Sequence, residues 1–114
     1  MKNYFVDDKN LYPSEAELLR IKTAKVNRDN LDEFMNSFKD YWSKYGSWRK
    51  QGNYYRLATG GWSGNEEIIS ALMGNLQFWY FYWTLSMKGG LFIFGHTDHW
   101  EDCEKDDAMI REWI

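Results

Sequence analysis

Apolar residues recur with helical spacing in two stretches near the start of the chain. The first, residues 14–25, opens with Ser14 and Glu17 at the spacing of a capping box, which predicts a short helix. In the second, residues 30–45, apolar side chains recur at intervals of three and four. That stripe predicts one continuous helix, with Gly46 as the residue that follows its last turn.

The middle of the chain alternates between strand-like and helix-like segments. Residues 54–59 predict a strand bounded by glycines. Ser63 and Glu66 repeat the capping-box spacing, so residues 63–74 predict a third helix. The run 78–85 is dominated by aromatic residues, which are enriched in strands, and it therefore favours a central strand.

The last third of the chain predicts a hairpin and then a tail. Residues 88–90 have the composition of a tight turn, after which residues 91–94 return as the neighbouring strand. Residues 100–114 favour a last helix, because several of their apolar side chains share one face. The order helix–helix–strand–helix–strand–strand predicts an α+β domain with a small antiparallel three-stranded sheet and helices packed on one face.

Composition is that of one soluble domain, residues 1–114. The chain is 44% hydrophobic and 19% aromatic, which supplies a dense core for its size. A single cysteine, Cys103, excludes a disulfide framework and a cysteine zinc site, so a reducing cytoplasm is expected. The first ten residues lack the apolar region of a secretory signal, and residues 76–85 are too few to cross a membrane. We therefore expect a cytoplasmic protein without a membrane anchor.

Charge is distributed unevenly along the chain. The net charge is −3, and residues 98–114 hold seven acids against two bases, a net charge of −5. Residues 1–97 are close to neutral, with twelve bases against ten acids, a net charge of +2. So few cations argue against tight binding to nucleic acid, where phosphate contacts set the affinity. The acidic tail is either a solvated face or an anionic surface that mimics nucleic acid or docks on a basic partner.

The predicted sheet has two faces of different character. The first is apolar without hydroxyl groups and must be covered by helices, whereas the second carries Tyr80 and Tyr82. That second face either packs on the tail or on a second subunit, or it offers a stacking platform for a planar ligand. So large an apolar surface on a short chain favours a homo-oligomer.

The most distinctive run joins the strand at 54–59 to the helix at 63–74. It reads Thr59-Gly60-Gly61-Trp62-Ser63-Gly64-Asn65-Glu66. Glycines between a strand and a helix let backbone approach a ligand closely, and the first amides of the helix point toward it. The spacing is that of neither a dinucleotide fingerprint nor a P-loop. The alternative is a strand-to-helix turn that binds nothing.

This region resembles a family of small uncharacterised proteins of tailed bacteriophages and prophages. The resemblance rests on residues 57–69 and, further on, on Phe78, Trp79, Trp83 and the glycine pair at 89–90. Members of that family usually carry two arginines before the glycine pair, where this chain has Met87 and Lys88. The resemblance implies a phage accessory protein that acts in the cytoplasm of its bacterial host, and it implies no reaction.

Groupings with catalytic potential are sparse. His96, Asp98 and His99 offer metal-ligand chemistry, but they share one loop and no recognised ligand motif. Cys103 stands among acids and is a poor candidate nucleophile. We therefore expect a protein that is not an enzyme and that uses neither a metal nor a cofactor.

One hypothesis for function is a binder that sequesters a small nucleotide-derived signal of bacterial anti-phage defence. Aromatic rings would stack on the base, glycine backbone would line the pocket, and cations would meet the phosphate. The expected ligand-binding residues are Arg56, Thr59, Gly60, Gly61, Trp62, Ser63, Gly64, Asn65, Glu66, Tyr80, Tyr82 and Lys88.

The alternative hypothesis is a protein-binding inhibitor of a bacterial defence complex, comparable to a small anti-CRISPR protein. Residues 98–114 would be its docking surface, and binding would weaken with salt. On this hypothesis, deletion of residues 98–114 should abolish inhibition and leave the fold intact.

Overall fold

The computed structural model describes residues 12–114, so the expectation about a secretory signal concerns residues outside the described range. The helices are α1 (Glu15–Thr23), α2 (Leu31–Asn36), α3 (Ser63–Gly74), α4 (Leu76–Tyr82) and α5 (Cys103–Trp113), with 3₁₀ turns at Lys39–Tyr41 and Trp100–Asp102. The strands are β1 (Ser47–Gln51), β2 (Tyr54–Ala58), β3 (Trp83–Met87) and β4 (Leu91–Gly95).

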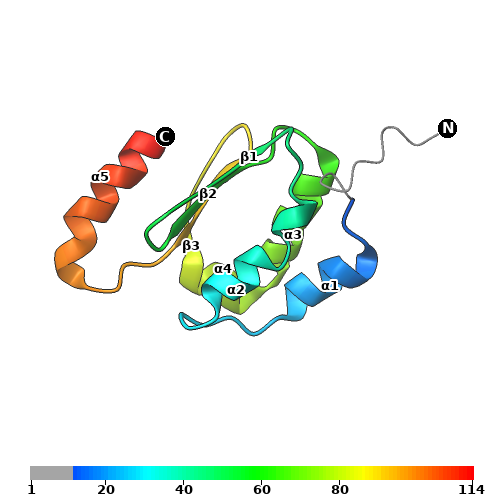
Figure 1. The fold of residues 1–114 in the computed structure, drawn as a ribbon, viewed down its shortest axis with the longest axis horizontal. Helices are drawn as coiled ribbons and strands as arrows, with labels where there is room; N and C mark the ends of the chain where they lie inside the picture. The colour runs from blue at the N-terminus through cyan, green and yellow to red at the C-terminus, as the bar shows by residue number, and fades with distance from the viewer. Residues whose placement is uncertain (1–11) are drawn as a thin grey trace.

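The four strands form one antiparallel sheet in the order β1-β2-β4-β3. Helices α1 to α4 pack against one face of this sheet, and α5 lies against the other (Figure 1). The α+β class is compatible with this architecture. The prediction of a three-stranded sheet with helices on one face is wrong, because a fourth strand is present and the last helix occupies the opposite face.

The missed strand is β1, which forms a hairpin with β2 around Gly52 and Asn53. Only Trp48 of β1 turns toward the core, while Arg49, Lys50 and the rest of the strand are exposed. An edge strand with one solvated face shows little apolar alternation. The glycine and asparagine before residue 54 therefore looked like the start of a strand instead of the turn between two.

The aromatic run begins as helix α4 and becomes strand β3 only after Tyr82. Asn75 accounts for the change: its Oδ1 accepts a hydrogen bond from the Phe78 N–H at 3.1 Å and so caps the new helix. Its Nδ2 donates to the carbonyl oxygens of Ile21 and Ala24, at 3.0 and 2.8 Å. Phe78 and Tyr82, one helical turn apart, are both buried in the core. This cap and this packing outweigh the strand preference of aromatic residues.

The predicted long helix over residues 30–45 is also shorter than expected. Helix α2 ends at Asn36, and the chain is extended again by Trp42. The Ser37 hydroxyl donates to the Phe34 carbonyl, a side-chain bond that competes with continued helix. Gly46 ends no helix. A Cβ there would lie 2.1 Å from the Ala58 carbonyl oxygen, so the glycine permits close approach to β2.

The other predicted elements are confirmed. Helix α1 starts at its expected cap, where the Ser14 side chain accepts from the Glu17 N–H at 3.1 Å. Strands β2 and β4 and helix α3 lie where the sequence placed them. No helix among residues 12–114 is long and apolar enough to span a lipid bilayer.

The acidic tail forms a helix that covers the second face of the sheet. Ile110 and Trp113 of α5 pack with Tyr54 and Ile93. Arg56 reaches over from β2, and its Nε donates to the Trp113 carbonyl oxygen at 2.9 Å. Tyr80 and Tyr82, predicted to lie on this face, belong to α4 instead, and the face that the tail covers carries Tyr54, Leu85 and Ile93.

Candidate functional site

The glycine-rich run forms a tight turn between β2 and α3, and the turn is bonded to the β3–β4 hairpin. The Thr59 N–H donates to the Gly90 carbonyl oxygen at 3.0 Å. Gly60 and Gly61 both have positive φ angles, 63° and 78°. A Cβ on Gly60 would lie 2.0 Å from the Tyr45 carbonyl oxygen. Gly60 therefore has a packing role, since the backbone of the preceding loop occupies the space beside it.

Asn65 is fully buried and has both ends of its amide in use. Its Oδ1 accepts from the Ser43 N–H at 2.8 Å, and its Nδ2 donates to the Thr59 carbonyl oxygen at 3.1 Å. The side chain thus ties the first turn of α3 to the loop before β1. Asn65 therefore links two internal segments, and it does not bind a hydroxyl or amino group of a ligand as expected.

Trp62 lies over the turn as a half-buried cover. A Cβ on Gly64 would lie 2.1 Å from the Trp62 ring, so the glycine makes room for the indole. The edge of the ring meets Tyr12, with centroids 5.4 Å apart. Tyr12 in turn donates from its hydroxyl to the carboxylate of Glu67. Ser63 provides no cap here: the residue before the helix is Trp62, and no side chain bonds the first amides.

Beside the turn is a cavity of about 180 Å³, lined by Thr59, Glu66, Ile69, Gly90 and Phe92. Pockets for drug-sized ligands usually measure roughly 300–1,000 Å³, so this cavity suits a small chemical group and is too small for a whole nucleotide. The Glu66 carboxylate gives the cavity a negative wall. Lys88 lies in the same hairpin as Gly90, with its side chain exposed to solvent.

Three of the expected site residues lie apart from this turn. Arg56 is bound to the end of α5 on the other face of the sheet. Tyr82 is buried against Phe78, with ring centroids 5.6 Å apart, and its burial raises the pKa of its phenol. Tyr80 is 82% exposed on α4, which begins at the far end of α3. A helix of twelve residues spans about 18 Å, so Tyr80 and Trp62 cannot hold the same ring between them.

The histidine loop has a structural arrangement. Asp98 accepts from Asn53 Nδ2 at 2.8 Å, and its other oxygen lies 3.6 Å from an Arg28 nitrogen. His96 is almost buried, with Nδ1 2.9 Å from the Asp98 carboxylate but outside hydrogen-bond geometry. His99 is exposed. Among residues 12–114, no group of three or more His, Cys, Asp or Glu side chains is arranged to hold a metal ion.

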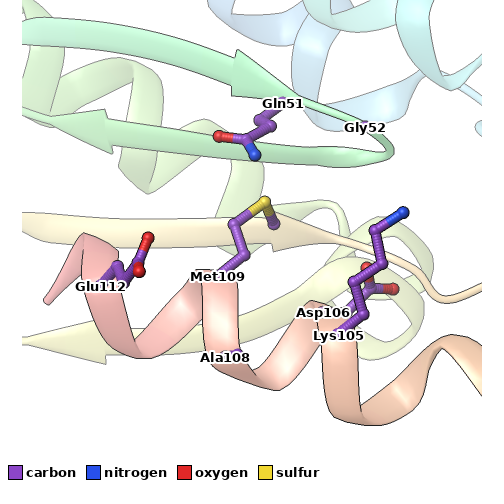
Figure 2. Close-up of a pocket in the computed structure, with 7 residues that line it drawn as sticks. All are labelled: Gln51, Gly52, Lys105, Asp106, Ala108, Met109 and Glu112. Carbon is purple, nitrogen blue, oxygen red and sulfur yellow. The ribbon is translucent and has the colours of Figure 1, made fainter.

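A larger cavity, about 390 Å³, separates α5 from the β1–β2 turn. Figure 2 shows Met109 pointing from α5 toward the strands, with Gln51 opposite it. The other lining residues are Gly52, Lys105, Asp106, Ala108 and Glu112. Sequence reasoning missed this cavity, because it depends on β1, the strand that the pattern did not reveal.

Helix α5 carries exposed carboxylates on the side turned away from the sheet and at the rim of the larger cavity. Glu104, Asp107 and Glu112 are exposed, and within residues 12–114 no carboxylate of α5 lies in an ion pair with a lysine or arginine. Asp106 is the one α5 acid with a side-chain hydrogen bond in this region, from the Thr97 hydroxyl at 2.8 Å. The helix therefore presents negative charge while its inner side is fixed to the sheet.

Comparisons of the chain with protein-family models, with curated proteins and with solved structures found no match.

Proposed function

We propose that this chain is a non-enzymatic, protein-binding inhibitor that docks through the acidic outer side of α5. Its partner would be a bacterial defence protein with a positively charged surface, met in the cytoplasm of the host. The class of partner follows from the resemblance to phage proteins, and the docking surface follows from the contacts of α5.

The observation that carries the proposal is a helix fixed on one side with its carboxylates free on the other. Its inner side is held by the contacts of Ile110 and Trp113 with the sheet and by the bond from Arg56. The exposed acids of α5 are Glu104, Asp107 and, at the rim of the larger cavity, Glu112; none of them has a cationic partner among the described residues. Carboxylates carried on a docked helix lose little backbone freedom when a partner binds. This favours a specific docking surface over a face that only contacts solvent.

The distribution of charge supports the same proposal. Residues 98–114 carry a net charge of −5, and the rest of the chain carries +2. Four of the seven acids in residues 98–114 and both bases lie in α5 itself, a net charge of −2 for the helix. Concentrating one sign on one segment increases the rate of encounter with an oppositely charged protein and makes that rate sensitive to salt.

The nucleotide-binding hypothesis has less support from the geometry. The glycines of the turn and Asn65 serve internal packing, and the cavity beside them is about 180 Å³. Arg56, expected to meet a phosphate, is bound to the end of α5 instead. A nucleotide would have to bind largely outside the turn.

The test of the proposal must leave α5 in place. Deleting residues 98–114 would uncover Tyr54 and Ile93 and so confuse loss of docking with loss of fold. We suggest instead the triple substitution Glu104→Gln, Asp107→Asn and Glu112→Gln. A matched control, Glu15→Gln, Glu33→Gln and Asp40→Asn, changes the net charge equally at exposed positions away from α5.

The readout is plaque formation by a defence-sensitive phage on bacteria that carry a defence system and express each variant. The original chain and the control should restore plaques in at least one of a panel of systems, and the α5 variant should lose at least about tenfold of that effect. Equal activity of the α5 variant would show that another surface docks. A chain that restores plaques with no system would contradict a counter-defence role.

A second measurement separates the two hypotheses. Mass spectrometry of small molecules released by heating the purified protein should find no stoichiometric nucleotide. Release of such a compound, and its loss in Trp62→Ala, would establish sequestration in place of protein docking.

A further inference from the structure

Helix α4 and strand β3 expose an unusual amount of apolar side chain, which we call the α4–β3 surface. Its exposed members are Leu76, Tyr80, Phe81 and Trp83, with exposed fractions of 77, 82, 61 and 42%. Leu76 and Tyr80 are one helical turn apart, and the rings of Tyr80 and Phe81 touch, with centroids 5.2 Å apart. These residues therefore form a patch and are not scattered singly, which is typical of an interface.

The α4–β3 surface belongs to a stretch that carries no charge at all. From Asn75 to Met87 the sequence contains no Asp, Glu, Lys, Arg or His, although 27% of the whole chain is charged. A partner protein of unlike charge finds nothing to pair with there. Two copies of this neutral surface, by contrast, meet without placing like charges next to each other, and salt screens the repulsion between the net charges of −3.

Strand β3 adds a directional feature, because it is an edge of the sheet. Only β4 pairs with it, and among residues 12–114 no other backbone group bonds to its outer side. The opposite edge, β1, carries Arg49 and Lys50, charges of the kind that discourage strand pairing. The edge of β3 has no such protection, and its free backbone groups are complementary to another extended strand.

We propose that two copies of this chain associate through β3 and α4 about a two-fold axis. Antiparallel pairing of β3 with its own copy satisfies that symmetry, since each strand then meets the same strand of its partner. Regular pairing in β3 covers only Leu85 to Met87, because the ladder is irregular between Trp83 and Leu85. So short a backbone contact cannot hold two chains together, and the rings of Tyr80 and Phe81 must supply most of the affinity.

This inference does not depend on the proposed function. Helix α5 lies on the other face of the sheet from α4 (Figure 1), so association through α4 and β3 leaves the acidic helix accessible. A dimer would carry two acidic helices, which strengthens binding to any partner that offers two basic sites.

The test is the mass of the chain in solution, measured by analytical ultracentrifugation at increasing protein concentration. The original chain should reach twice 13.7 kDa. The double variant Tyr80→Glu and Phe81→Glu should remain a single chain, with affinity reduced at least about a hundredfold because each change occurs twice across a two-fold interface. Both side chains are exposed, so the variant should keep its fold, which circular dichroism would check.

The matched control is Leu19→Glu with Tyr45→Glu. These side chains are 60 and 67% exposed, and they lie outside the α4–β3 surface. The control should associate like the original chain. A single-chain mass for the original protein at every concentration, or an unchanged dimer in the Tyr80 and Phe81 variant, would overturn the inference.

Hydrogen exchange of the β3 amides tests the strand pairing separately. Exchange within Trp83–Met87 should slow as the protein concentration rises, and it should be independent of concentration in the double variant. A dimer whose β3 exchange does not change with concentration would assign the association to a different surface. Because these readouts involve no phage and no partner, their failure is distinguishable from failure of the proposed docking by α5.

Discussion

The two faces of the sheet are covered in different ways. Toward α1–α4, sixteen buried apolar residues of the described chain form one cluster, whereas toward α5 there are four. The first face therefore provides most of the hydrophobic stabilisation, and the second holds one helix by a small apolar contact and a few hydrogen bonds. We infer that α5 opens at a lower free energy than the rest of the molecule, as a separate local unit.

The largest expected effect comes from a substitution that creates a cavity on the α1–α4 face. Phe78 is completely buried, so Phe78→Ala should lower the free energy of unfolding by about 4 kcal/mol. The measurement is chemical denaturation followed by fluorescence. Leu19→Ala is the control, and it should stay within about 0.5 kcal/mol because that side chain is 60% exposed and lies outside the α4–β3 surface. Equal losses from both substitutions would contradict the assigned core.

A cavity under α5 should have a smaller and more local effect. Ile110→Ala removes one of the four buried residues on that face, and we expect a loss of about 2 kcal/mol. Hydrogen exchange should accelerate in Cys103–Trp113 before it does so in α3. Arg111→Ala, on the exposed side of α5, is the control. If both helices accelerated together, the two faces would form a single cooperative unit.

Two neighbouring tyrosines report on the two faces as the pH rises. Tyr55 faces α1–α4 and Tyr54 faces α5, and burial raises the pKa of both phenols above the ordinary value of 10.0. The unfolded chain therefore loses these protons first. The stabilising effect of each neutral phenol is complete below pH 10 and declines as the pH rises above it.

Substitution by phenylalanine should remove that dependence. Burial is the main cause at both positions, and the hydrogen bond from Tyr55 to Asp32 raises its pKa further. Between neutral pH and pH above 10, the fall in melting temperature should be smaller in Tyr55→Phe than in the original chain, with a weaker change in Tyr54→Phe. If the melting temperature falls as steeply with pH in both variants as in the original chain, other titrating groups cause the pH dependence.

How far the sequence predicts this fold depends on whether a local signal agrees with the tertiary packing. Helix α1 with its Ser14 cap and strand β2 follow from such signals, whereas helix α3 forms at the predicted residues without the Ser63 cap on which its prediction rested. The aromatic run failed because residue preference favoured a strand, while Asn75 and the buried rings of Phe78 and Tyr82 required a helix. Nothing local in the sequence reveals that Asn75 bonds to a segment more than fifty residues away.

The candidate site shows the same limit. Its glycines were correctly located in a turn between a strand and a helix, but their neighbours could not be inferred. Gly60 fits against the Tyr45 backbone and Asn65 bonds to Ser43, and both contacts depend on β1, which the sequence pattern did not show. A run rich in glycine is compatible with a ligand or with close backbone packing, and only the tertiary structure separates the two.

The strand order also has a consequence for the way the chain reaches this structure. β4 is the last strand to be synthesised, yet it lies inside the sheet, between β2 and β3. The β1–β2 hairpin can form early from neighbouring residues, but its inner edge stays open until Leu91–Gly95 has been made. Joining the two hairpins requires contacts between distant parts of the chain, and such contacts form slowly. We therefore expect this joining step to limit the rate of folding, and a nascent chain that stops before β4 to be prone to aggregation.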